Sequence, residues 1–286
     1  MSWTIALVQM DCVAGDTEAN LIRIAARAAE AAERGAQLVL FPECATTGYF
    51  VADRIASLAE PVPGPSSDRL ARLARGAGVH LMVGMIEQAE GKYFDDAVLF
   101  TPDGDEHVYR KTHLFGPERA IFTPGDQPVV VETALGRLGL SVCYDLMFPE
   151  FIRSLVLNGA QVVLNATDWI TDAWQNSMGW SADTVSSLAR IRALENGVHV
   201  AMADRAGIEA GWRSLGGSTV ASPTGRVLAA LGADEGVATA KIDIESADFA
   251  RWSELATYVQ DRRPELYERK VIRASPRSGE RRPRRR

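Results

Sequence analysis

The chain has 286 residues, of which 47% are hydrophobic and 24% are charged, and its formal net charge is −6. These proportions are ordinary for a globular protein, and no apolar run approaches the ~20 residues that a membrane helix needs. Residues 1–4 enter a strand directly, without the basic region and apolar core of a secretory signal. We therefore predict a cytoplasmic protein with no membrane partner.

The charge is unevenly distributed along the chain. Residues 277–286 contain six arginines and one glutamate, a net charge of +5, which leaves −11 on the remainder. An acidic body provides no general basic surface for nucleic acid, and chain ends are usually loosely ordered unless they are tied down. We predict one domain over residues 1–272, an arginine-rich, disordered tail over 273–286, and no nucleic-acid partner.

Cysteine and histidine are sparse. The three cysteines, Cys12, Cys44 and Cys143, form an odd set that argues against a disulfide framework and for a reducing compartment. The four histidines are scattered, without the spacing that metal ligands show. We predict no metal site and no cofactor.

The first half of the sequence alternates between strand and helix signals. Short apolar runs predict strands at 5–9, 37–41 and 79–86. Between them we expect one helix that begins at Asp16 or Thr17 and ends at Gly35, and a second that is capped by Ser66 or Ser67. A Pro-Asp-Gly turn at 101–104 then joins two hairpin strands, 93–100 and 106–110. Strand, helix and strand in this order indicate a crossover connection and parallel strands.

The second half repeats this scheme. We expect strands at 139–142, 161–165 and 198–203, helices at 149–158 and about 181–195, a hairpin across 222–225, and a final strand over 236–243. No low-complexity linker divides the halves. The pattern therefore predicts a single α/β domain with helices outside and sheets inside.

Cys143 stands at the turn between one of these strands and the following helix. The strand ends at Val142, and Pro149 and Glu150 suit the first turn of a helix. Free backbone N–H groups at such a turn stabilise a thiolate and lower its pKa. We expect Cys143 to be reactive, whereas Cys44 is expected to belong to the core.

Two further segments accompany the cysteine. Together with Cys143-Tyr144-Asp145, the tripeptide Phe41-Pro42-Glu43 and the segment from Tyr109 to Gly116 resemble the Glu–Lys–Cys motifs of the nitrilase superfamily, the carbon–nitrogen hydrolases. The intervals, 68 residues from Glu43 to Lys111 and 32 from Lys111 to Cys143, are also similar to that family. The resemblance extends over residues 5–267 and implies a four-layer α-β-β-α sandwich.

The three residues suit the hydrolysis of an amide. Cys143 is the expected nucleophile, and Glu43, at a strand end, is the expected base. Lys111 and the backbone N–H of Tyr144 are expected to stabilise the oxyanion. The resemblance assigns the same roles, with a thioester intermediate and release of ammonia or an amine.

Other residues are expected around the triad. Glu118 matches a second glutamate of the family, which either orients the substrate or holds the lysine. The expected pocket walls are aromatic: Tyr49, Phe115, Phe148, Trp169 and Trp174. Residues 166–180 depart from the family pattern, so the identity of the substrate is the least constrained part of the prediction.

Several alternatives remain open. Tyr144-Asp145 favours the amidase-like branches over the nitrilases, which commonly place Trp-Glu after the cysteine, and a small carboxamide is the preferred substrate. A nitrilase or an N-carbamoyl hydrolase would use the same triad, and a non-catalytic interaction module is the alternative from a different class.

The C-terminal segment predicts self-association. Apolar residues from Trp252 to Tyr267 follow the last expected strand, and an extension of this kind covers either its own body or a neighbour. Related hydrolases form two-fold dimers, so the resemblance implies a homodimer or a larger even-numbered assembly.

Overall fold

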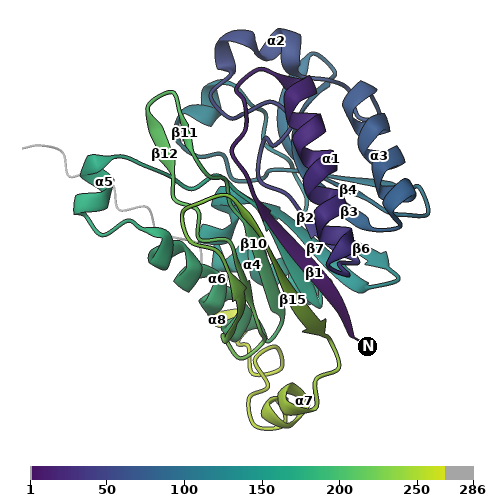
Figure 1. The fold of residues 1–286 in the computed structure, drawn as a ribbon. Helices are drawn as coiled ribbons and strands as arrows, with labels where there is room; N and C mark the ends of the chain where they lie inside the picture. Colours follow the sequence, from purple (N-terminus) through teal and green to yellow (C-terminus); the bar gives the residue numbers. More distant parts are fainter. Residues whose placement is uncertain (1, 268–286) are drawn as a thin grey trace, which may run out of the picture.

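The computed structural model describes residues 2–267, apart from the side chains of Ala247 and Asp248. The described chain forms two six-stranded sheets that pack face to face between layers of helices (Figure 1). One apolar core contains residues of both sheets, including Leu7 and Leu40 of the first and Leu140 and Leu164 of the second. The predicted tail, 273–286, lies outside the described residues.

The first sheet has the order β15-β1-β2-β3-β4-β5. Its strands are β1 (Ser2–Gln9), β2 (Leu38–Leu40), β3 (His80–Ala89), β4 (Lys92–Phe100), β5 (Glu106–Arg110) and β15 (Gly236–Asp243). Strands β1, β2 and β3 are parallel, and the others are antiparallel to their neighbours. Residues of β1 alternate between the core between the sheets (Ile5, Leu7) and the core under the outer helices (Ala6, Val8), as the two-residue period of a strand requires.

Helices α1 (Thr17–Glu33) and α3 (Pro65–Ala77) cover the outer face of this sheet. Asp16 caps α1, because its Oδ1 accepts a hydrogen bond from the N–H of Ala19 at 3.0 Å. The prediction that Ser66 or Ser67 caps α3 is wrong: the helix begins at Pro65, with Gly64 as its N-cap residue. Proline at the first helical position has no N–H to leave unpaired, which explains the earlier start.

The second sheet has the order β14-β13-β10-β8-β7-β6. Its strands are β6 (Val129–Thr133), β7 (Gly136–Val142), β8 (Val162–Ala166), β10 (His199–Ala203), β13 (Thr219–Ala221) and β14 (Val227–Ala230). Strands β7, β8 and β10 are parallel, and helices α4 (Pro149–Leu157) and α6 (Ala182–Asn196) pack on their outer side. The expected helices and parallel strands of this half are present, and the edge strand β6 is an addition.

The last strand closes the first sheet. Strand β15 pairs antiparallel with β1 over its whole length, from Ser2 opposite Asp243 to Gln9 opposite Gly236. The chain then continues into the short helices α7 (Ala247–Ser253) and α8 (Pro264–Tyr267). None of the helices formed by residues 2–267 is both long and apolar enough to cross a bilayer.

Smaller elements gather at the carboxyl ends of the parallel strands. They are the helical turns η1 (Ala52–Arg54), η2 (Gly116–Ala120) and η3 (Cys143–Met147), helices α2 (Ile55–Leu58) and α5 (Ala173–Ser177), and a three-stranded sheet of β9 (Ile170–Thr171), β12 (Trp212–Ser214) and β11 (Ile208–Glu209). In open α/β sheets this edge is where ligands bind.

Candidate active site

Glu43, Lys111 and Cys143 converge at this edge. Glu43 follows β2, Lys111 follows β5 and Cys143 follows β7. Glu43 and Cys143 meet at the backbone of one residue: Glu43 Oε2 accepts the Asp168 N–H at 2.9 Å, and Cys143 Sγ lies 3.9 Å from the Asp168 carbonyl oxygen. The fold thus brings together three residues that the sequence separates by 100 positions.

The Lys111 ammonium lies among three carboxylates. Its Nζ donates to Glu43 Oε1 at 2.5 Å, to Asp95 Oδ2 at 3.0 Å and to Glu118 Oε1 at 2.8 Å. Three carboxylates so close together could hold a metal ion, but the ammonium takes that position. Of the two roles expected for Glu118, the geometry favours holding the lysine, and Tyr49 OH also donates to Glu118 at 2.5 Å.

Burial and mutual repulsion shift the protonation of this cluster. Burial raises the pKa of Glu43 well above its usual range, and Asp95 and Glu118 raise it further, whereas Lys111 opposes the shift. Burial alone lowers the pKa of Lys111, but the three carboxylates outweigh it and raise that pKa above its usual range. These opposed effects favour the cationic form of Lys111, and they make the Glu43 carboxylate a stronger proton acceptor than an exposed one.

Cys143 occupies a strained elbow. Its φ of +41° lies in the left-handed region, which a residue with a Cβ adopts at a cost of about 1–3 kcal/mol. It opens the turn η3, whose first N–H groups have no partner inside the turn. The elbow itself is as predicted, but the expectation of a lowered thiol pKa is wrong, because burial and the nearby Glu43 raise the pKa of Cys143.

Asp145 holds the elbow against the lysine segment. Its Oδ2 accepts from the Val142 N–H at 3.0 Å and from Tyr109 OH at 2.7 Å. Its Oδ1 accepts from the His113 N–H at 3.0 Å and from Thr112 Oγ1 at 3.0 Å. One fully buried carboxylate therefore ties the residue before Cys143 to both sides of Lys111.

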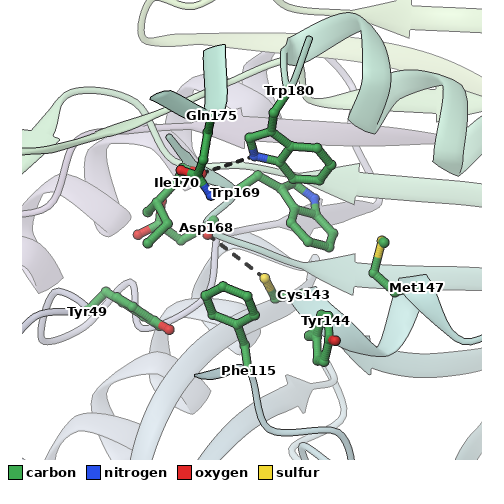
Figure 2. Close-up of a pocket in the computed structure, with 10 residues that line it drawn as sticks. All are labelled: Tyr49, Phe115, Cys143, Tyr144, Met147, Asp168, Trp169, Ile170, Gln175 and Trp180. Carbon is green, nitrogen blue, oxygen red and sulfur yellow. Dashed lines mark hydrogen bonds between the residues drawn. The ribbon is translucent and has the colours of Figure 1, made fainter. Parts of the chain in front are cut away.

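A cavity of about 220 Å³ opens above the cysteine (Figure 2). Tyr49, Phe115 and Trp169 line it as predicted, and Tyr144 contributes its ring. Phe148 does not: it stacks on His113 with 3.9 Å between ring centroids, one layer behind Tyr144. Trp174, also expected in the wall, is not among its lining residues and is 68% exposed.

The sequence reasoning did not single out the other residues of the wall, which are Met147, Asp168, Ile170, Gln175 and Trp180. Trp180 reaches the cavity from the segment between α5 and α6, donates its Nε1–H to the Ile170 carbonyl at 3.1 Å, and meets Trp169 edge to face. In the sequence, the abundance of tryptophan in 166–180 was the feature that could have indicated a further aromatic wall here. The departure of this segment from the family pattern therefore coincides with one side of the cavity.

A buried ion cluster fixes the loop that carries Tyr49. Arg205 Nη1 contacts Asp168 Oδ2 at 3.2 Å and Glu209 Oε2 at 2.5 Å. The Glu209 carboxylate accepts the N–H groups of Tyr49 and Phe50 at 3.2 and 2.6 Å. Through Glu209, this cluster links the backbone of the loop that carries Tyr49 to Asp168 on the cavity wall.

Thr167 lies beside the cysteine. Strands β7 and β8 pair with Val142 opposite Ala166. Cys143 and Thr167, the residues that directly follow these two strands, are therefore neighbours. Thr167 is fully buried, and its hydroxyl beside the sulfur acts to lower the pKa of Cys143 against the larger effect of burial. Cys44, by contrast, is fully buried in an apolar cluster, as predicted.

Comparison with known proteins identifies the family. The model of the carbon–nitrogen hydrolase family matches residues 4–251. The chain belongs to the carbon–nitrogen hydrolase family. This hydrolase is 33% identical to a probable nitrilase of Schizosaccharomyces pombe, with 94% of this chain and 98% of that protein covered. It is 34% identical to an (R)-stereoselective amidase of Pseudomonas sp., with 91% of each chain covered.

Solved structures agree with this assignment. An amidase from Nesterenkonia sp. superimposes with a TM-score of 0.79 at 33% identity, covering 93% of this chain and 95% of that one. A variant of that amidase shows covalent addition of the acetamide moiety of fluoroacetamide at its active-site cysteine. The predictions of an α-β-β-α sandwich and of an amidase-like carbon–nitrogen hydrolase are confirmed.

Proposed function

We propose that this hydrolase cleaves small carboxamides through a thioester on Cys143, with Glu43 and Lys111 as the other catalytic residues. One observation carries the proposal: Glu43 is fixed between Lys111 Nζ and the Asp168 N–H, and the carbonyl of the same Asp168 faces the Cys143 sulfur at the base of the cavity. A variant of the Nesterenkonia sp. AN1 amidase binds butyramide, a carboxamide of the size that this cavity admits.

Glu43 transfers the protons. It takes the proton of the Cys143 thiol as the sulfur attacks the carbonyl carbon, and it gives that proton to the leaving nitrogen as the C–N bond breaks. Ammonia or an amine departs, and a thioester remains. Glu43 then takes a proton from water as the oxygen attacks the thioester carbonyl carbon. The C–S bond breaks, Glu43 gives that proton to the departing sulfur, and the acid leaves with the Cys143 thiol and the Glu43 carboxylate restored. The raised pKa of Glu43 suits both directions of transfer.

Lys111 acts on the oxyanion through its charge. An ammonium has three N–H donors, and Glu43, Asp95 and Glu118 already take three hydrogen bonds from it. A further direct hydrogen bond to the substrate would require one of these to be shared. The N–H of Tyr144, early in η3, is therefore the direct donor, and Glu118 supports the reaction by holding the lysine.

Ammonia release tests the proposal. The wild-type protein is expected to release ammonia from butyramide, and Cys143→Ala is expected to lose this activity while keeping its circular dichroism spectrum and melting temperature. Cys12→Ala is the matched control, because Cys12 is also buried but does not line the cavity. Nitriles and N-carbamoyl compounds complete the panel. Activity retained by Cys143→Ala, or turnover of no member of the panel, would refute the mechanism.

We also propose a homodimer or larger even-numbered assembly in the cytoplasm. Trp252, Leu255 and Leu266 are 42, 83 and 47% exposed, and apolar side chains exposed along one segment favour burial against a neighbour. All three cysteines are free, which suits a reducing compartment.

Light scattering tests the assembly. The molar mass of the full chain should be at least twice 31.0 kDa, and truncation before Trp252 should lower it. Truncation after residue 271 should leave the molar mass unchanged. A full-length monomer would refute the assembly.

A further inference from the structure

A second cavity adjoins the one above Cys143. Its volume is about 430 Å³, and it shares the side chains of Tyr49, Phe115, Ile170 and Gln175 with the first. In Figure 2, Tyr49, Ile170 and Gln175 lie on one side of Cys143, opposite Met147. The second cavity therefore extends the site away from Met147, past the ring of Phe115.

The second cavity is apolar and wide. Apart from the side chain of Glu118, its remaining walls are apolar and come from residues 50–55, from β3, from η2 and the two residues after it, and from β12: Phe50, Val51, Ala52, Ile55, Ile86, Pro117, Ile121, Phe122 and Trp212. An apolar cavity of about 150 Å³ is enough to hold a benzene molecule. At about 430 Å³, this space accepts a phenyl-sized group and leaves room around it.

Within residues 2–267, no cationic side chain is available to a bound ligand. None of the described residues that line either cavity is lysine, arginine or histidine. The nearby Arg205 is fully buried and engaged by Asp168 and Glu209, and Lys111 is engaged by its three carboxylates. A substrate carboxylate would therefore lose its hydration without gaining a partner, which is strongly unfavourable.

The acids on the walls are also engaged. Glu118 accepts hydrogen bonds from Lys111 and Tyr49, and Asp168 from Ser214 and Arg205. A substrate ammonium would have to displace one of these partners. The walls therefore select against both signs of charge.

We propose that the preferred substrates are neutral carboxamides that carry a phenyl-sized apolar group, with the amide above Cys143 and the apolar group in the second cavity. The inference rests on the proposed amide hydrolysis and adds the class of substrate. The group can be attached to the acyl chain or to the amide nitrogen, and both attachments leave the bond changes described above unaltered.

A series of amides tests the inference. The kcat/KM values of propionamide, 3-phenylpropionamide and N-benzylpropionamide are compared, with ammonia or benzylamine as the measured product. Complete burial of a phenyl group predicts a gain of about 10- to 100-fold for at least one of the two aromatic amides. Succinamate, compared with the neutral pentanamide of similar length, should be at least about tenfold poorer.

A matched pair of variants locates the effect. Ala52 is exposed and lines the second cavity, whereas Ala56, exposed on α2, does not line it. Ala52→Trp should narrow the cavity and remove most of the gain of the aromatic amide over propionamide, measured as the ratio of their kcat/KM values. Ala56→Trp should alter neither value.

The outcomes separate this inference from the proposed function. If propionamide is hydrolysed but neither aromatic amide is favoured, or if succinamate is preferred over pentanamide, the inference is overturned and amide hydrolysis stands. If Ala52→Trp leaves the aromatic preference intact, the second cavity is not where the group binds. If no amide of the series reacts, the proposed function itself fails.

Discussion

Asp145→Asn is the most informative single substitution outside the triad. The change keeps the size of the side chain but removes its charge and replaces one acceptor oxygen by an NH₂ group, which only donates. Asp145 is fully buried and accepts hydrogen bonds from both Val142, which precedes the nucleophile, and the segment that carries Lys111. The substitution therefore loosens two catalytic residues at once.

The magnitude follows from the donors that are left unpaired. If the asparagine oxygen replaces Oδ2, the His113 N–H and the Thr112 hydroxyl lose their acceptor; if it replaces Oδ1, the Val142 N–H and Tyr109 OH lose theirs. A hydrogen bond to a charged group contributes about 1.5–3 kcal/mol, and an unsatisfied buried donor costs about 1–3 kcal/mol. We expect the free energy of unfolding to fall by about 2–5 kcal/mol, a large part of the 5–15 kcal/mol that is typical of native proteins.

Urea unfolding and steady-state kinetics measure the two consequences. The unfolding midpoint should decrease, and kcat for butyramide should fall at least about tenfold at a temperature where the variant is still folded. Asp103→Asn, an exposed aspartate in the turn between β4 and β5, should change neither quantity. A variant with wild-type stability and wild-type kcat would show that Asp145 does not hold the elbow.

Two other substitutions probe the groups around the sulfur. Lys111→Arg keeps the charge, but a planar guanidinium does not fit among three carboxylates at a fully buried site. We therefore expect kcat to fall at least about 100-fold. A near-normal kcat would show that Lys111 has only a structural role. Thr167→Val removes the hydroxyl beside Cys143 and should move the alkaline side of the kcat/KM profile to higher pH, with Thr167→Ser restoring it; identical profiles would show that the hydroxyl does not act on the sulfur.

The parts of the site that the sequence predicts are those with a local signal. The apolar strand that ends at Val142 and the proline at 149 predict the elbow, and the hairpin around 101–104 predicts where Lys111 is delivered. The partners of these residues depend on how distant strands pair. Asp95 is one example: it holds Lys111 from β4, and its only signal was a pair of acids, Asp95 and Asp96, inside a strand that is otherwise mostly apolar.

The pKa of Cys143 shows the same division between local and distant effects. From the sequence, the N–H groups of the elbow predict a lowered thiol pKa. The structure adds complete burial and the carboxyl group of Glu43, which follows strand β2 of the other sheet, and both raise the thiol pKa. A local argument gave the wrong sign here because the larger contribution comes from tertiary packing.

This correction leads to a prediction for Glu43→Gln. Glu43 repels a thiolate and Lys111 attracts it, so removal of the negative charge should lower the pKa of Cys143. Alkylation by iodoacetamide at neutral pH should then be faster than in the wild-type protein, because the thiolate is the reacting form. Hydrolysis of butyramide should be lost at the same time, because the group that transfers the proton is missing.

The pH dependence of labelling makes the test sharper. In the wild-type protein the alkylation rate of Cys143 should keep rising above pH 9, since its thiol pKa lies above the usual value, whereas in Glu43→Gln it should level off at lower pH. Peptide mapping should find Cys143 modified before Cys12 and Cys44, because it alone of the three lines the cavity above the triad. Slower alkylation in Glu43→Gln would mean that the carboxylate activates the thiol more than its charge suppresses the thiolate, and the electrostatic assignment made here would be wrong.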